Sequence, residues 1–489
     1  MLKNTEIEKM FNPTATDVAY TQDEQLKISL ICRLDSYKFG HHLGYPDNIE
    51  AQSSYGESRL DNHETIVPFG MQMLIKRYLS QSVTMADVDA AEQFSELHFG
   101  RKLFDRKGWE KVVNVYNGKL PLIIRSVPEG TVMHARLPIY SVTVFDKDLY
   151  WMSAGFETLI QRGIWYPTTV VTKDYNIRKV IKGYYDITGA NLDLLPFSYH
   201  DFAGRGVTCA EQAEIGGAAH MVNFMGSDTV EGVLAANFYY KEVMSGFSVY
   251  ATEHAVECSF GGGAEDAKAY IKKQLKNALP GTIVSIVIDG YDVYREAELL
   301  CTYFRDDIIA SNAKVVFRPD SGDMNIVVPR ILQLQEVAFG TKITSKGYKQ
   351  IQHVGVIQGD GVDHESLTSL MRLVINMGYS ADCVIFGSGG ALLQKVNRDT
   401  LKFAQKASAI LINGEWVGIA KDPVTDQGKK SKEGILTTVR SNVNGEMMSA
   451  RLNVNHLNSE WTDIMQLVYF KGTLYNETTL SDVRGRVSR

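Results

Sequence analysis

The chain has 489 residues, of which 44% are hydrophobic and 22% are charged, and its net charge is −6. This length accommodates about two or three domains with large cores, and the composition is that of an ordinary globular protein. The negative charge argues against a general nucleic-acid-binding protein. The five cysteines are scattered without a C-x-x-C pair, which fits free thiols in a reducing cytoplasm. We find no run of about 18 apolar residues that would span a membrane.

The first third of the chain predicts a polar extension followed by mixed helices and strands. Residues 1–25 are polar and lack the apolar core of a signal peptide. A turn-rich stretch is expected up to residue 62, and a helix-rich region up to about residue 116. The individual elements that we predict are a strand at 28–32, a helix at 72–79, strands at 120–127 and 140–145, and a helix at 149–164 that ends before Pro167.

From residue 167 to residue 407 the chain repeats one unit, which is an apolar strand, a loop rich in Asp, Gly or Arg, and an amphipathic helix. Units of roughly 30–40 residues predict parallel strands with crossover helices. The many polar loops favour an irregular (β/α) barrel over an open doubly wound sheet. We therefore predict an α/β protein with a barrel domain at 167–407. Residues 26–166 are expected to join 408–489 in a discontinuous α+β sandwich domain, after the polar extension 1–25.

A glycine-rich turn at 387–390 follows the apolar run 383–386 and precedes a helix pattern at 391–396. Glycines at such a turn let the backbone approach a ligand and direct several N–H groups toward one anion. The helix start behind them would add a positive dipole end, and Arg398 and Lys406 follow with cationic side chains. Most glycine-rich turns only reverse the chain, so this turn alone is weak evidence for phosphate binding. The polar loops that precede it strengthen the prediction of a phosphate site.

The predicted strand ends carry arginines, which pair bidentately with phosphate, and aspartates, which suit Mg²⁺ and sugar hydroxyls. Together these groups predict binding of a phosphorylated ribose. Helix capping by Asp289 and Asp360, surface ion pairs for the arginines, and a core position for Phe202 are the alternatives. The residues expected at the carboxyl end of the barrel are Arg205, Asp228, His254, Asp289, Arg318, Asp320, Asp360 and Arg398.

Seven motifs occur in this order along the chain: Asp35-Ser-Tyr-Lys38, His200-Asp-Phe-x-x-Arg-Gly206, Gly226-Ser-Asp-Thr229, Ala251-Thr-Glu-His254, Arg318-Pro-Asp-Ser-Gly322, Ile357-Gln-Gly-Asp-Gly361 and Phe386-Gly-Ser-Gly-Gly390. Together they resemble the motifs of the nicotinamide phosphoribosyltransferase family. Members of that family make nicotinamide mononucleotide and pyrophosphate from nicotinamide and phosphoribosyl pyrophosphate, with Mg²⁺. The resemblance implies a homodimer with active sites at the subunit interface, and ATP hydrolysis through a phosphorylated histidine.

The resemblance also implies how the pyridine ring is bound. Phe202 would stack on one face of the ring and Tyr37 of the partner subunit on the other. Asp228 would accept a hydrogen bond from the carboxamide and disfavour the negative charge of nicotinate. Ser285 would be a second contact near the ring.

The remaining roles implied by the resemblance concern phosphate, ribose, metal and ATP. His254 would bind phosphate groups and be the phosphorylated residue, and Lys429 would approach ATP. Asp289 and Asp320 would hold the ribose and Mg²⁺. Pyrophosphate or ribose contacts are expected from Arg205, Arg318, Gly359 and Asp360, and 5′-phosphate contacts from Gly389, Gly390, Arg398 and Lys406.

Two positions differ from the family pattern, Gly355 in place of an expected arginine and Ala404 in place of a frequent serine. Both concern phosphate or ATP contacts. The alternatives are a nicotinate phosphoribosyltransferase, which Asp228 argues against, and a non-catalytic binding protein on the same scaffold. An aldolase-type barrel enzyme would need a Schiff-base lysine at a strand end, and no lysine stands out there.

Overall fold

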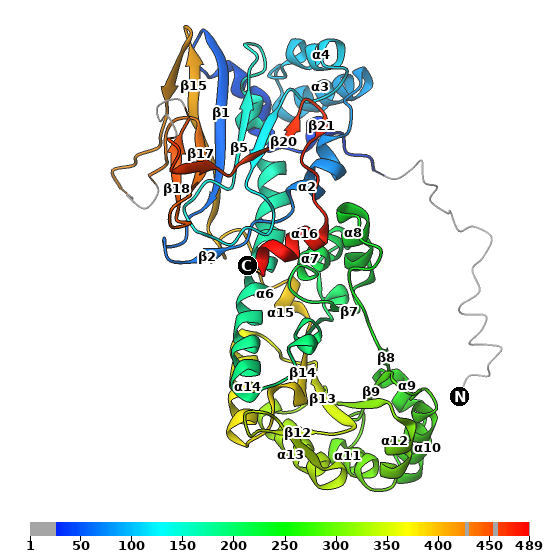
Figure 1. Cartoon of the computed structure of the whole chain (residues 1–489). Coiled ribbons are helices and arrows are strands. Elements are labelled where there is room, and N and C mark those ends of the chain that lie inside the picture. Colours follow the sequence, from blue (N-terminus) through cyan, green and yellow to red (C-terminus); the bar gives the residue numbers. More distant parts are fainter. Residues whose placement is uncertain (1–25, 426–429, 453–457, 489) are drawn as a thin grey trace, which may run out of the picture.

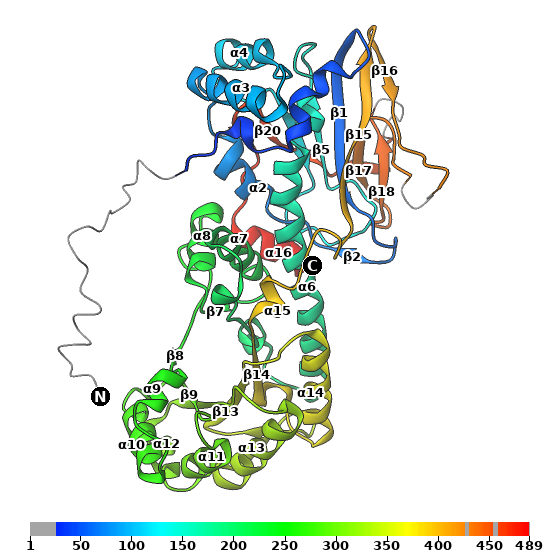
Figure 2. The same ribbon diagram turned by 180° about the vertical axis from the view of Figure 1, so that it is seen from behind.

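The structure is a computed structural model that describes residues 26–425, 430–452 and 458–488. Figures 1 and 2 show an antiparallel sheet with helices beside it and a second part built around parallel strands, with the long helix α6 (Glu157–Thr188) running along both. Each part has its own hydrophobic core, and Trp165 of α6 packs against both cores. Among the described helices, none is long and apolar enough to cross a membrane.

The antiparallel sheet takes strands from both ends of the described chain. Its order is β16 (Glu415–Gly418), β15 (Phe403–Ile412), β1 (Ile49–Ser58), β5 (Tyr140–Val144), β3 (Ile123–Ser126), β20 (Gln466–Phe470) and β21 (Thr473–Leu474). Helices α3 (Met85–Phe99) and α4 (Arg106–Val115) lie beside this sheet (Figure 1). A smaller sheet has the order β18 (Met447–Arg451), β17 (Leu436–Ser441) and β19 (Trp461–Asp463).

Strand β1 lies where the sequence predicted turns, so that prediction is wrong. Its polar side chains are buried and find hydrogen-bond partners on neighbouring elements. The Ser53 hydroxyl lies 3.0 Å from the Thr143 hydroxyl, and the Ser54 hydroxyl lies 2.8 Å from that of Ser153. Because these pairs satisfy the buried hydroxyl groups, a polar sequence can form a central strand.

Two predicted elements near the ends of this region differ from the structure. The strand expected at 28–32 is instead a 3₁₀ turn, Leu30–Cys32, in which the Ser29 hydroxyl accepts the Ile31 N–H. The helix expected to end before Pro167 is α5 (Met152–Gly155) followed by α6, which continues through Pro167. Pro167 is buried, and tertiary packing along α6 outweighs the roughly 3 kcal/mol cost of an interior proline. The domain boundary expected after residue 166 therefore falls inside one helix.

Seven parallel strands form the second sheet. Their order is β7 (Gly226–Ser227), β6 (Tyr199–Asp201), β14 (Val384–Ser388), β13 (Val354–Gln358), β10 (Lys314–Arg318), β9 (Ile283–Val287) and β8 (Tyr250–Ala251). One chain segment, 247–251, links the two edges, because β8 pairs with β9 while Phe247 hydrogen-bonds to Met225 and Ser227 around β7. The sheet thus curls into an irregular barrel.

Helices follow most of these strands, as expected for crossover units. They are α7 (Ala210–His220), α8 (Val230–Tyr240), α9 (His254–Cys258), α10 (Ala264–Leu275), α11 (Val293–Cys301), α12 (Arg305–Ser311), α13 (Met324–Phe339), α14 (His364–Asn376) and the short α15 (Gly390–Leu393). The last helix, α16 (Leu480–Val487), packs its apolar residues into the barrel core. The predicted fold class, an irregular (β/α) barrel with an α+β sandwich, is confirmed.

Candidate active site

The parallel register brings the carboxyl ends of the barrel strands together, and most of the predicted site residues lie there. Asp228 follows β7, His254 follows β8, and Asp289 follows β9. Arg318 ends β10 and is followed by Asp320, while Ser285 lies buried inside β9. Phe202, Gly359, Asp360, Gly389 and Gly390 follow β6, β13 and β14.

An aromatic ring and two glycines form a close-packed floor. A Cβ atom on Gly387 would lie 2.0 Å from Phe202 Cε2, so only glycine leaves space for the ring. A Cβ atom on Gly359 would lie 2.8 Å from Asp320 Oδ1 and 3.6 Å from Phe202 Cε2. Phe202 is only partly buried, unlike a core phenylalanine. The aromatic face and the Asp320 carboxylate therefore lie together beside backbone that carries no side chain.

Asp228 is exposed and oriented by two contacts. Its backbone N–H donates to Asp201 O at 2.9 Å, and its carboxylate accepts the Ser248 hydroxyl. His200 lies behind the β7 backbone, with its ring 2.6 Å from where a Gly226 Cβ would stand. Burial lowers the pKa of His200 to about 4, so this histidine is neutral at pH 7 and the exposed charge here is that of Asp228. Ser248, which opens the segment that leads into β8, was not predicted as a site residue.

His254, Asp289 and Asp320 form a chain of contacts across three strand ends. His254 Nε2 lies 3.0 Å from Asp289 Oδ1, and the Asp320 N–H donates to Asp289 Oδ2 at 2.9 Å. The Asp289 side chain is 2% exposed, whereas that of His254 is 46% exposed. Asp289 is thus a fixed carboxylate that orients an accessible imidazole.

The cationic groups at this end are only partly engaged. Arg318 Nη2 donates to Thr252 O at 2.7 Å, but its buried Nε has no hydrogen-bond partner among the described residues. Arg205 is exposed and forms no hydrogen bond or ion pair within the described part of the chain. A Cβ on Gly206, the next residue, would lie 3.2 Å from Gly390 N, so the Arg205 loop borders the glycine turn. Free guanidinium donors in this position suit an anion.

The two helix-capping alternatives can be decided from the structure. Asp292, rather than Asp289, caps α11, and Asp363, rather than Asp360, caps α14. The carboxylates of Asp289 and Asp360 therefore do not serve as N-caps of these helices. The helix behind the glycine turn, α15, has only four residues. It is shorter than the pattern predicted, so the backbone N–H groups rather than a helix dipole favour an anion there.

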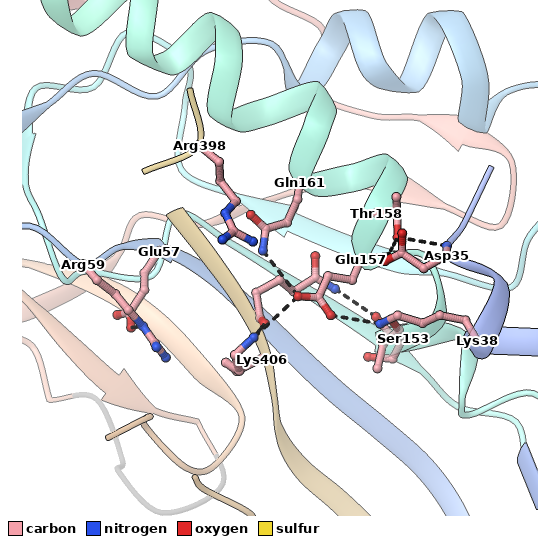
Figure 3. Close-up of polar contacts among 12 residues, drawn as sticks. Asp35, Lys38, Glu57, Arg59, Ser153, Glu157, Thr158, Gln161, Arg398 and Lys406 are labelled. Carbon is pink, nitrogen blue, oxygen red and sulfur yellow. Dashed lines mark hydrogen bonds and ion pairs between the residues drawn. The ribbon is translucent and has the colours of Figure 1, made fainter. Parts of the chain in front are cut away.

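Arg398 and Lys406 were expected beside the glycine turn, but within one chain they lie elsewhere. They line a hollow of about 470 Å³ with Arg59, Glu157 and Gln161, and Figure 3 draws these five side chains. None of the described residues that line the hollow is a barrel strand end. The glycine turn and the hollow contact α6 at different places. Lys173 of α6 donates to Ala391 O of α15, just after the glycine turn, whereas Gln161, twelve residues earlier on α6, lines the hollow. At 1.5 Å per helical residue the two regions are about 18 Å apart along α6.

The lining of the hollow is strongly basic, and its two acidic residues are Glu157 and Asp399. Lys38 Nζ and Lys406 Nζ lie 2.9 Å and 3.5 Å from the Glu157 carboxylate (Figure 3). Burial opposes ionisation of Glu157, but these two lysines lower its pKa overall. Arg398 is 58% exposed, and among the described residues its one ion pair is a 3.4 Å contact with adjacent Asp399. Its guanidinium is thus available to an anionic ligand.

Three remaining predictions have different outcomes. Tyr37 is 58% exposed, and its ring contacts His41 and lies below Lys38 Nζ, while its contact with the pyridine ring of the partner subunit stays a prediction. Lys429 lies outside the described residues. The described residues contain no group of three or more His, Cys, Asp or Glu side chains that could hold a metal ion, which leaves the Asp289 and Asp320 pair.

Comparison with known proteins agrees with this geometry. Residues 197–458 match the Nicotinate phosphoribosyltransferase (NAPRTase) family, and residues 29–124 match the Nicotinamide phosphoribosyltransferase, N-terminal domain. A nicotinamide phosphoribosyltransferase of Xanthomonas campestris is 41% identical over 93% of this chain and 97% of its own length. One of Acinetobacter baylyi is 28% identical over 95% of this chain and 98% of its own.

Two solved structures share the fold at low sequence identity. A nicotinate-nucleotide pyrophosphorylase from Pyrococcus furiosus superposes with a TM-score of 0.60 at 15% identity, covering 97% of each chain. Human nicotinic acid phosphoribosyltransferase gives a TM-score of 0.56 at 14% identity, covering 93% of this chain and 92% of its own. The sequence matches and the shared fold together place this chain in the nicotinate phosphoribosyltransferase family, among the nicotinamide phosphoribosyltransferases.

Proposed function

We propose that the protein transfers the phosphoribosyl group of phosphoribosyl pyrophosphate to nicotinamide, giving nicotinamide mononucleotide and pyrophosphate in NAD salvage. The observation that carries this proposal is the exposed Asp228 carboxylate, which accepts the Ser248 hydroxyl, while the Asp228 N–H donates to Asp201, the residue before Phe202. The names of the bacterial relatives support the same reaction.

The choice of nicotinamide follows from charge. The Ser248 hydroxyl donates to Asp228 Oδ1, and the remaining lone pairs of the carboxylate can accept a hydrogen bond from an amide N–H. A carboxylate in the place of that amide would meet like charge and would also lack a donor. Phe202 supplies the apolar face on which the pyridine ring stacks, and Ser285 is near the ring plane in this proposal.

The chemical step is driven by charge placement around the ribose. Loss of pyrophosphate leaves positive charge at the ribose C1, which the carboxylates of Asp289 and Asp320 stabilise. Arg205, Arg318 and His254 neutralise the leaving pyrophosphate, while Gly359 and Asp360 bind ribose hydroxyls. The pyridine nitrogen carries no proton, so it attacks without a general base, and holding it in line supplies much of the acceleration.

Mg²⁺ fits the donor set at the mouth. The ion commonly uses one or two carboxylates together with substrate phosphates, and Asp289 and Asp320 are adjacent through the Asp320 N–H contact. When bound, it would neutralise the developing charge on pyrophosphate. Asp289 also orients His254, whose exposed ring is open to a phosphoryl donor. On that basis we also propose that ATP phosphorylates His254, with Lys429 near the ATP.

A homodimer would complete the site. Arg398 and Lys406 are separated from the glycine turn of their own chain, and Tyr37 is exposed. A second copy can bring Tyr37 of the partner subunit to the ring and the basic hollow to the 5′-phosphate held at Gly389 and Gly390. Helix α8, which begins just after Asp228, presents an exposed apolar stripe suited to such an interface, namely Val230, Leu234 and Phe238.

The test is product formation by purified protein with phosphoribosyl pyrophosphate, Mg²⁺ and either nicotinamide or nicotinate, with and without ATP. Chromatography separates the two mononucleotides, and Asp320→Asn is the inactive control. We expect nicotinamide mononucleotide, formed faster with ATP. Turnover that ATP does not change would retain the transferase and remove the His254 step. No product from either base would favour a non-catalytic binding protein.

A further inference from the structure

Two buried carboxyl groups lie under the Asp289–Gly290 turn, and the proposed reaction does not use them. Glu257 on α9 is 2% exposed and Glu296 on α11 is 1% exposed. Both groups only accept hydrogen bonds when ionised, so a hydrogen bond between them requires a proton on one of them. Burial, with the nearby Glu257 carboxyl, raises the pKa of Glu296 to about 8, so the pair retains this proton at pH 7.

Glu257 connects two backbone segments that carry site residues. Both its oxygens lie 3.0 Å from the Gly290 nitrogen, whose N–H donates to them. A Cβ on Gly290 would stand 2.6 Å from the Glu257 carboxyl carbon, so the turn rests directly on the carboxyl group. Gly290 follows Asp289 in sequence, and Glu257 lies three residues after His254 on the short helix α9.

These contacts close a ring. Glu257 binds Gly290, Gly290 is joined to Asp289, Asp289 contacts His254, and α9 returns the chain to Glu257. The ring also reaches the next strand end, because Asp289 Oδ2 accepts the Asp320 N–H. A displacement of the Asp289–Gly290 turn would therefore alter three proposed site residues together.

Arg295 and Glu296 are neighbours on α11, the helix that follows the Asp289–Gly290 turn. Arg295 Nη1 donates to Gly262 O at 3.1 Å, and its Nη2 lies 3.5 Å from Glu296 Oε1. Glu296 Oε2 is buried and has no hydrogen-bond partner among the described residues. A proton held on Glu296 would satisfy this atom and replace two repelling charges by one neutral and one charged group.

We propose that Glu257 is a positioning residue for the transfer reaction, which keeps His254 and Asp289 in contact by holding the Asp289–Gly290 turn against α9. This inference rests on the proposed function. The competing interpretation is a purely stabilising role, in which loss of Glu257 lowers the melting temperature but leaves the folded enzyme fully active.

The test compares Glu257→Ala and Glu257→Gln with two controls. Glu129→Ala removes another buried carboxyl group, which accepts from Tyr240 at the end of α8 remote from Asp228. Glu298→Gln changes an exposed residue of α11, the helix that carries Glu296. Each variant is assayed for kcat and for KM of nicotinamide at a temperature where circular dichroism shows it to be folded.

We expect Glu257→Ala to lower kcat about 10- to 100-fold with KM for nicotinamide changed less than about threefold, since misplaced reacting groups cost rate. Glu257→Gln keeps an acceptor for Gly290 and should retain about a third or more of wild-type kcat. Both controls should keep wild-type kcat. The positioning role is wrong if Glu257→Ala lowers kcat no more than Glu129→Ala does. It is also wrong if kcat of Glu257→Gln is as low as that of Glu257→Ala.

A second readout does not depend on turnover. In protein labelled with ¹³C at histidine Cε1, the His254 signal is assigned with His254→Gln. Glu257→Ala should shift this signal and Glu129→Ala should not. An inactive wild-type protein would refute the proposed function, whereas an unmoved His254 signal would refute the positioning role of Glu257.

Discussion

Replacing Asp228 by Asn tests whether charge selects the substrate. The change removes one negative charge at an exposed position and keeps an oxygen that accepts from the carboxamide. A hydrogen bond to a charged group is worth about 1.5–3 kcal/mol and a neutral one about 0.5–1.5 kcal/mol. The loss for nicotinamide should therefore be about 1–1.5 kcal/mol, or roughly tenfold in kcat/KM.

Nicotinate should gain from the same change. Two unit charges about 4 Å apart repel by about 1 kcal/mol in bulk water and about 4 kcal/mol near a protein surface. Because Asp228 is exposed, the repulsion lies within this range, which corresponds to at least about fivefold in kcat/KM for nicotinate. The ratio of the two kcat/KM values should shift by about 50-fold or more toward nicotinate.

The assay measures kcat/KM for both bases with the wild-type protein, Asp228→Asn and Ser248→Ala. Ser248→Ala is the matched control, because it removes the hydroxyl that orients Asp228 but retains the charge. We expect Ser248→Ala to slow the use of nicotinamide without reversing the preference. An unchanged selectivity ratio in Asp228→Asn would refute the electrostatic explanation.

Three further predictions use other contacts. Gly387→Ala should lower kcat/KM for nicotinamide about 10- to 100-fold, because the added methyl group displaces the Phe202 ring. The control is Gly183→Ala, at an exposed helix position where a Cβ would meet no atom within 4 Å. It should raise the free energy of unfolding by about 0.5–1 kcal/mol and leave activity unchanged. The pKa of His200 is lowered to about 4 in the folded protein, so between pH 6.5 and 4 the unfolded chain binds a proton at His200 more readily than the folded protein does. The free energy of unfolding should therefore fall by about 3 kcal/mol as the pH falls from 6.5 toward 4. In denaturant melts over this pH range, the free energy of unfolding should fall less for His200→Asn than for the wild type. An identical fall would contradict the assignment of His200 as a buried neutral histidine. Mixing inactive Asp320→Asn with inactive Arg398→Ala should restore about a quarter of wild-type activity, since random exchange gives half mixed dimers with one intact site each. No recovery after confirmed subunit exchange would show that Arg398 acts within its own chain.

The parallel part of the fold was predictable because each strand is an apolar run followed by a polar loop. Once the strands are parallel, their carboxyl ends meet, so Asp228, Asp289 and Asp320 were expected together before any coordinates. Strand β1 was not predictable in this way. Its buried serines satisfy each other and their neighbours through hydrogen bonds, which a hydrophobic pattern cannot reveal.

Local sequence rules also misjudged positions where tertiary contacts decide. Pro167 would end an isolated helix, yet α6 continues because its residues are buried along both cores. Arg398 follows the glycine turn closely in the sequence, so both were predicted to contact the same phosphate group. The chain instead enters β15 of the antiparallel sheet and takes Arg398 to the side of Glu157. The Glu257–Glu296 pair gave no signal, because two acidic residues 39 positions apart look like ordinary helix surface.

The most direct test of substrate choice is a competition in one tube. Purified wild-type protein receives phosphoribosyl pyrophosphate, Mg²⁺ and equal concentrations of nicotinamide and nicotinate, and the two mononucleotides are quantified by chromatography during the first few per cent of conversion. The product ratio equals the ratio of kcat/KM values. We predict that nicotinamide mononucleotide predominates by at least about 50-fold, the selectivity assigned to the Asp228 charge. Equal products, or an excess of nicotinate mononucleotide, would contradict the assignment of Asp228 as the group that selects the amide.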